Sequence, residues 1–122
     1  MQDQPGPRQG DGASLGRLPG DLGDLPAAQV ISGLAVHLMS AAAARLGLSE
    51  ESARHRDLGE ARALITALAG LVTAGAPVID PQYATPLRDG LAALQLAYRE
   101  ACGHPQPPGA GPGEGLTGPV YR

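Results

Sequence analysis

The first candidates for chemistry in this sequence are the imidazole of His37, which lies within an apolar stretch, and the single thiol, that of Cys102. A metal site on a helix needs a second histidine or an acidic residue three or four positions from the first. Positions 33, 34, 40 and 41 hold Gly, Leu, Ser and Ala, so His37 has no such neighbour. The other histidines, His55 and His104, fall in polar or Gly/Pro-rich segments. We therefore expect no metal site and a His37 that is hydrogen-bonded at a helix packing surface.

Nucleophilic or acid–base catalysis has little support elsewhere in the chain. Cys102 has no base directly beside it, and Asp80 and Asp89 do not form a carboxylate pair with catalytic spacing. No glycine-rich loop joins a strand to a helix, and a single cysteine excludes an intramolecular disulfide. The sequence therefore predicts a protein without catalytic activity, cofactor or metal. An enzyme that uses His37 or Cys102 is a remote alternative.

The basic run Arg54-His55-Arg56 could bind an anion, but acidic residues around it neutralise its charge. These acidic residues are Glu50, Glu51, Asp57 and Glu60. A solvated linker is therefore favoured over an anion site. The formal net charge of −3 argues against general nucleic-acid binding, so no DNA partner is expected. An alternative function is that of a ribosome- or RNA-associated factor that uses Arg54, Arg56 and Arg62.

Three segments with helical periodicity must position these residues. The first helix is expected over about residues 26–46, with Asp24 as its N-cap. Gly47 should end it in the left-handed conformation, with Leu48 folding back as the hydrophobic contact. One face of this helix carries mostly small residues and is the candidate interface: Gly33, His37, Ser40 and Ala44.

The second helix is expected over residues 57–75, where Asp57 and Glu60 resemble a capping box. Its apolar positions form a coiled-coil-like seam of Leu58, Ala61, Ile65, Leu68, Val72 and Gly75. The third helix is expected over residues 85–102, because Thr85-Pro86 is a typical start signal. It carries apolar residues at steps of three and four: Leu87, Leu91, Leu94, Tyr98 and Ala101.

The domain organisation follows from the distribution of glycine and proline. Residues 1–23 and 103–122 hold most of both, and such segments bury too little apolar surface to offset the cost of ordering them. We therefore expect disordered tails on both sides of an all-helical domain at residues 24–102. The chain has no Phe, no Trp and three Tyr, so its core must be thin and its helices close together. The predicted fold class is all-α, a small three-helix bundle.

The first helix is apolar around most of its circumference, and two neighbours within one three-helix unit cannot easily cover it. A membrane span needs about 20 mainly apolar residues. This stretch is short and is interrupted by Gln29, Ser32, His37 and Ser40, so no membrane partner is expected. We predict instead a soluble homodimer in which this helix contributes to the contact. No secretory signal is visible at the N-terminus, so a cytoplasmic location is expected.

Three sequence blocks carry a resemblance to a known family. They are "LMSAAAARLGLSEE" (38–51), "RDLGEARALITALAGLVTA" (56–74) and "PLRDGLAALQLAYREA" (86–101). With the C-terminal "GPGEGLTGPVYR", they resemble the actinobacterial branch of the bacterial family called domain of unknown function 1844 (DUF1844). The resemblance implies a small, all-helical, cytoplasmic protein with no established activity and no family site residues to carry over. Members of that branch are often encoded beside the gene for translation initiation factor three, which connects the resemblance to translation only by association.

Overall fold

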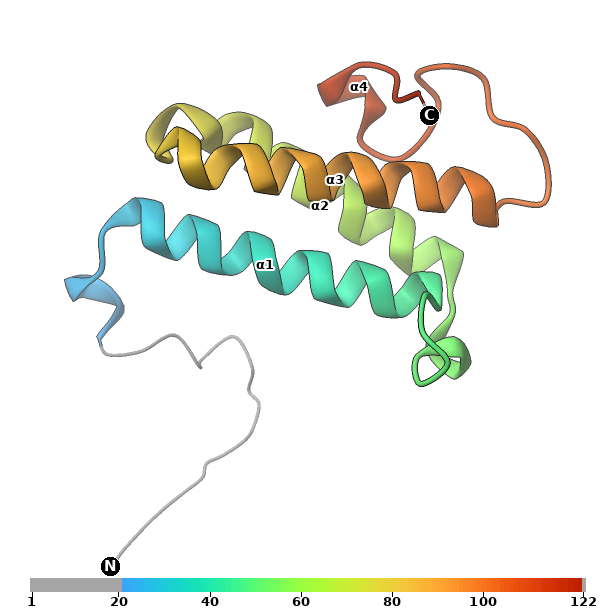
Figure 1. Ribbon diagram of the computed structural model, residues 1–122, viewed down its shortest axis with the longest axis horizontal. Helices are drawn as coiled ribbons and strands as arrows, with labels where there is room; N and C mark the ends of the chain where they lie inside the picture. The colour runs from blue at the N-terminus through green and yellow to red at the C-terminus, as the bar shows by residue number, and fades with distance from the viewer. Residues whose placement is uncertain (1–20, 122) are drawn as a thin grey trace, which may run out of the picture.

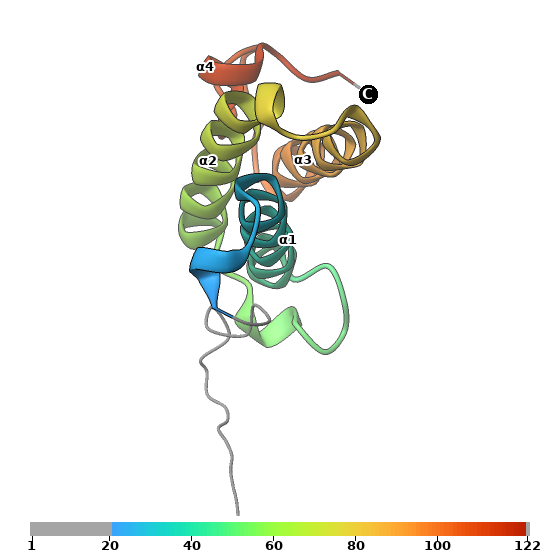
Figure 2. The same ribbon diagram turned by 90° about the vertical axis from the view of Figure 1, so that its left-hand side faces the viewer.

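The computed structural model describes residues 21–121, and within this range it is all-helical, as the sequence predicts. The long helices are α1 (Ala27–Leu46), α2 (Leu58–Gly75) and α3 (Pro81–Ala101), and a short α4 (Glu114–Thr117) follows. In the described part of the chain, three 3-10 helices lie between or before them: η3 (Leu22–Asp24), η4 (Ala53–His55) and η5 (Ala76–Val78). Helices α1 and α3 both pack against α2, and α4 lies over α2 and α3 on the side away from α1 (Figures 1 and 2).

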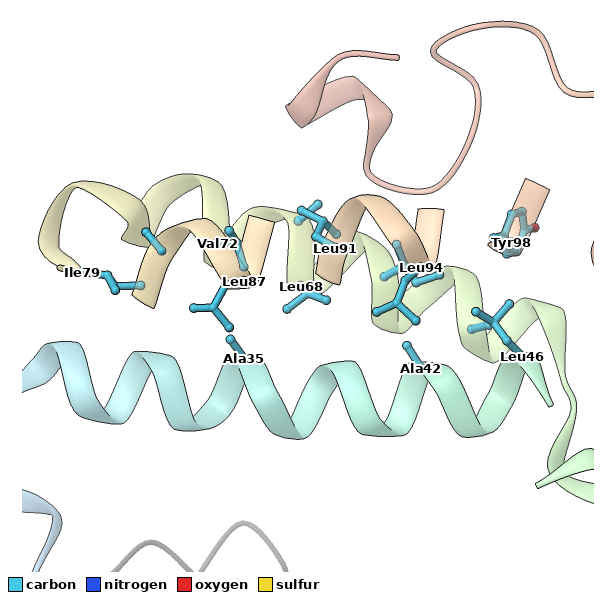
Figure 3. Close-up of a cluster of buried hydrophobic side chains, with 14 residues drawn as sticks. Ala35, Ala42, Leu46, Leu68, Val72, Ile79, Leu87, Leu91, Leu94 and Tyr98 are labelled. Carbon is cyan, nitrogen blue, oxygen red and sulfur yellow. The ribbon is translucent and has the colours of Figure 1, made fainter. Parts of the chain in front are cut away.

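The core lies where the three long helices meet. The predicted seam of α2 is confirmed, because Ala61, Ile65, Leu68, Val72 and Gly75 are buried and only Leu58 is half-buried. From α1, in contrast, the buried residues are Ala35, Ala42 and Leu46. The two alanines point toward the leucines of α3 (Figure 3). Because alanine fills little volume, the helices must approach closely to exclude water.

The backbone at the C-terminal end of α1 has the predicted left-handed glycine. Gly47 has a φ of 68°, and the N–H groups of Gly47 and Leu48 donate to the carbonyls of Ala44 and Ala43 at 3.0 and 3.3 Å. These two bonds form the expected Schellman turn. The predicted hydrophobic contact of Leu48 is wrong, because this side chain is exposed.

The start of α1 also differs from the prediction. Asp24 is not its N-cap but lies in η3, and Pro26 occupies the cap position without a side-chain hydrogen bond. Its extended backbone leads into the helix, and its carbonyl accepts from the N–H of Val30 at 3.2 Å. The fixed φ of proline therefore orders this entry where a capping carboxylate was expected.

Of the two hydrogen bonds of the predicted capping box at the start of α2, one forms. The Asp57 Oδ1 atom accepts from the backbone N–H of Glu60 at 3.1 Å. In a capping box the glutamate would bind the N–H of Asp57 in return. That N–H instead donates to the carbonyl of Arg45 at 2.7 Å. A contact between helices therefore replaces the second half of the box and fixes the start of α2 against the end of α1.

The predicted start of α3 at residue 85 is wrong, because the helix begins at Pro81. The carbonyl of Asp80 accepts from the N–H groups of Tyr83 and Ala84 at 2.8 and 2.9 Å. Pro86 lies inside the helix. Because proline has no backbone N–H, Pro86 removes one helical hydrogen bond, in an exposed turn near the start of α3. The earlier start is favoured because it buries Ala84 against the core.

The sequence predicts a disordered C-terminal tail over residues 103–122, but the described part of this tail, residues 103–121, is ordered. Residues 106–117, which we call the clasp, fold back across α2 and α3, and Gly111, Pro112 and Glu114 are buried. The predicted N-terminal tail, residues 1–23, lies mostly outside the described residues; its last residues enter η3. Polar contacts to α3, rather than burial of apolar side chains, order the clasp.

Candidate functional site

The predicted interface residues lie along one uncovered face of α1. Gly33, His37 and Ala44 are half-buried and Ser40 is exposed. Val36, beside them, is 53% exposed although it lies in the middle of the helix. In both views, one long side of α1 faces no other element of the described chain (Figures 1 and 2). The structure therefore leaves an apolar face, made largely of small residues, in contact with solvent.

His37 does not have the hydrogen bond that the sequence suggested. Within residues 21–121 its ring has no hydrogen-bond partner, and it is half-buried on the α1 face. Cys102 is a free, half-buried thiol at the end of α3. Among the described residues, no group of three or more His, Cys, Asp and Glu side chains could hold a metal ion. Within the described residues, no hydrogen bond joins His37 or Cys102 to another side chain.

Two of the three arginines considered for RNA binding are used inside the fold. The Arg56 guanidinium donates to the carbonyl of Ala101 at 3.1 Å. The guanidinium of Arg62 donates to the carbonyl of Ala110 at 2.9 Å and lies 5.8 Å from the ring centre of Tyr98. Arg54 is exposed, and its Nε donates to the ring of the neighbouring His55 at 3.4 Å. Arg56 therefore connects the segment before α2 to the end of α3, and Arg62 connects α2 to the C-terminal segment.

The site that sequence reasoning missed is the Arg99–Glu114 pair that anchors the clasp. Arg99 Nε and Nη2 donate to the two carboxylate oxygens of Glu114 at 2.7 and 2.8 Å. Its Nη1 and Nη2 also donate to the carbonyls of Gln106 and Pro107, both at 2.7 Å. The Glu114 side chain is 0% exposed and that of Arg99 17% exposed. Such a bidentate, charge-assisted pair is among the stronger hydrogen-bonded contacts in proteins.

One helical turn before Arg99, Gln95 completes the anchor. Its Nε2 donates to the carbonyl of Pro112 at 3.0 Å and to the hydroxyl of Thr117 at 3.1 Å. At Gly113 the backbone has a φ of 75°, and an added Cβ would lie 2.5 Å from the Cβ of Ala69. A glycine is therefore required both for the conformation and for the close approach to α2. The Gln95/Arg99 spacing on α3 was the available sequence signal.

The amino-acid sequence of the three long helices matches a known family. The model of the family described as Domain of unknown function (DUF1844) matches residues 27–100. The chain belongs to the DUF1844 family. No curated protein and no solved structure matches the chain significantly. The DUF1844 match spans α1 and α2 and ends one residue before the end of α3, so it includes Arg62, Gln95 and Arg99 but not the clasp.

Within residues 21–121, two segments are long and apolar enough to cross a membrane by length and composition alone, Ala27–Leu46 and Leu58–Val78. The core helix of a soluble protein passes the same test. The second segment contains the buried seam of α2, which packs against both other long helices. The first segment is the one with the uncovered apolar face. Any cover for that face must come from outside the described chain.

The charge on Glu114 gives the clasp a testable dependence on pH. Hydrogen bonds from Arg99 lower the pKa of Glu114 most, and the N–H of Gly109 also donates to it at 3.0 Å; burial alone would raise this pKa. The pKa of Arg99 is raised, first by its hydrogen bond to Glu114. The ionised pair is therefore the form that the fold stabilises.

We expect acid to loosen the clasp. Because the pKa of Glu114 is lower in the folded chain, its stabilisation is present above the unfolded value of about 4.3 and is lost as the pH falls through the folded pKa. The thermal midpoint of the full chain should therefore fall as the pH is lowered from about 5 through the folded pKa of Glu114. It should fall less in Glu114→Gln, whereas Glu51→Gln, at an exposed position, should behave like the wild type. Equal pH profiles for the wild type and Glu114→Gln would contradict this assignment.

Proposed function

We propose that this DUF1844 protein is a non-catalytic helical module of the cytoplasm that self-associates as a homodimer through the outer face of α1. The observation that carries the proposal is the burial pattern of α1. This helix has 20 residues and high hydropathy, yet its buried residues are only Ala35, Ala42 and Leu46. Val36 stays exposed beside the small residues of the same region.

Two physical arguments favour a second copy as the cover for this face. The small side chains of Gly33 and Ala44 allow two helices to approach closely, so that backbone and side-chain atoms gain contacts over a long stretch. The folded unit is also small and its core is rich in alanine. A domain of this size gains stability from burial between subunits. Symmetric dimers are the commonest form of such assembly, and His37 would then lie at or near the contact.

Sedimentation equilibrium on the purified full chain, without detergent, tests the proposal. We expect a dimer mass at tens of micromolar protein, an ordinary range for a modest protein interface. Val36→Arg should weaken the dimer by about tenfold or more, because an arginine would have to be desolvated in the contact. The matched control is Val78→Arg: Val36 and Val78 are 53% and 58% exposed, and Val78 lies in η5, outside α1. A monomeric wild type, or equal weakening by both variants, would reject the α1 contact.

The alternative function, a ribosome- or RNA-associated factor, has less support. Arg56 and Arg62 donate to carbonyls of the chain itself, which leaves them fewer donors for phosphate. Co-sedimentation with ribosomes that weakens with salt, and that is lost in Arg54→Gln, would favour this alternative over the dimer module. An enzyme based on His37 or Cys102 has no supporting cluster among the described residues.

A further inference from the structure

The surface beneath the clasp has the properties of a peptide-binding site. Its donors come from α2 and α3: Arg62, Gln95 and Arg99. They bind one carboxylate and four backbone carbonyls, those of Gln106, Pro107, Ala110 and Pro112. Backbone carbonyls and one acidic side chain are the groups that a peptide with a single acidic residue presents. All three donor residues lie within the family-matched region, whereas the clasp lies beyond it.

The clasp itself is held mainly by polar contacts. Leu116 and Tyr121, large apolar side chains in and just after it, are 54% and 75% exposed. A cavity of about 350 Å³ remains between α2, α3 and the C-terminal segment, lined by Val72, Leu91 and Leu116 among others. Hydrogen bonds to protein replace hydrogen bonds to water, so their net contribution is modest. The covalent connection through Gly103 and His104, both exposed, keeps the clasp at a high effective concentration.

These observations separate the structure into a binding surface and a tethered occupant. We propose that the surface formed by Arg62, Gln95 and Arg99 is an exchangeable site for a glycine-flanked acidic segment. The chain's own clasp occupies it within one molecule, and the same segment of a second copy occupies it when that clasp is released. The site lies on the side of α2 and α3 away from α1 (Figures 1 and 2). Its occupancy is therefore independent of the proposed contact through α1.

Peptide binding to the full chain tests the exchange. The probe is a fluorescent synthetic peptide with the sequence of residues 104–122. Gly113→Ala in the full chain should release the clasp, because the new Cβ would meet Ala69 and the backbone has a positive φ. The binding surface itself stays unchanged in this variant. We expect it to bind the peptide about tenfold or more tightly than the wild type, in which the tethered clasp competes at a millimolar effective concentration.

Matched controls identify the contacts. Gly115→Ala lies two residues further on, where an added Cβ meets nothing within 4 Å, and it should bind the peptide as weakly as the wild type. A probe with glutamine in place of Glu114 should lose binding to Gly113→Ala. Adding Arg99→Gln to the Gly113→Ala chain should do the same. These three results together would assign the site to the Arg99–carboxylate contact.

Hydrogen exchange of the unmodified protein provides a second measurement. If the clasp opens by itself, amides of the clasp such as that of Gly109 should exchange about a hundredfold faster than the buried amides of α2. Equal protection of the clasp and α2 would overturn the proposal. Cooperative unfolding of Gly113→Ala, or absence of peptide binding by this variant, would overturn it too. None of these outcomes depends on whether the chain is a dimer.

Discussion

Leu68→Ala should lower the free energy of unfolding by roughly 2–5 kcal/mol, the usual range for truncation of a core leucine. Leu68 is 0% exposed and lies in the middle of the α2 seam, where the core residues of all three long helices meet (Figure 3). The truncation would leave a cavity among the buried side chains of the three helices, which can close around it only in part. For a domain of this size, the thermal midpoint followed by circular dichroism should fall by roughly 10 °C or more.

The matched control for this truncation is Leu48→Ala. Leu48 is 59% exposed just after the end of α1. Removing it should change the free energy of unfolding by less than about 0.5 kcal/mol, as for most surface substitutions. Similar thermal midpoints for Leu68→Ala and the wild type would show that the α2 seam does not form the core. An equally large loss of unfolding free energy in Leu48→Ala and Leu68→Ala would also show that the α2 seam does not form the core.

Ala42→Leu should destabilise the protein by about 1–3 kcal/mol through overpacking. Ala42 has 0% exposure and points from α1 toward the leucines of α3 (Figure 3). The added carbons have no free volume to enter, so α1 must move outward from α2 and α3. Chemical denaturation of the full chain should therefore show a lower midpoint.

Ala67→Leu makes the same chemical change on the exposed side of α2 and should leave the denaturation midpoint nearly unchanged. If Ala42→Leu were neutral or stabilising, the contact between α1 and the other helices would be loose. The proposed explanation for small residues along α1, close approach of helices, would then fail within the subunit.

The parts of the fold that the sequence predicts are those with strong apolar periodicity. The seam from Ala61 to Val72 repeats at helical spacing, and its burial is confirmed. Boundaries were less accurate where two signals competed. Asp80-Pro81 and Thr85-Pro86 are both typical helix starts, and burial of Ala84 decides between them in favour of Pro81. This burial depends on the position of α2 and α1, which no local pattern contains.

The clasp could not be predicted from composition, because its order depends on specific polar partners. Glycine and proline raise the entropy cost of ordering, and few apolar residues offset it. In the structure, Arg99 and Gln95 bind the carbonyls and the carboxylate of this segment directly. The same glycines that suggested disorder permit the close approach at Gly113. For the α1 face the reverse holds: the sequence indicated a surface too apolar to be covered within one subunit, and that surface is uncovered in the described chain.

The hydrogen bond from the N–H of Asp57 to the carbonyl of Arg45 has a consequence for the order of folding. It closes a short loop, and short loops have a low closure entropy cost. We therefore expect the α1–α2 hairpin to form early in folding. The bond between Arg62 and Ala110 joins residues 48 apart and can form only after α3 is in place. Substitutions in the hairpin should then slow folding, whereas substitutions in the clasp should leave the folding rate unchanged and accelerate unfolding.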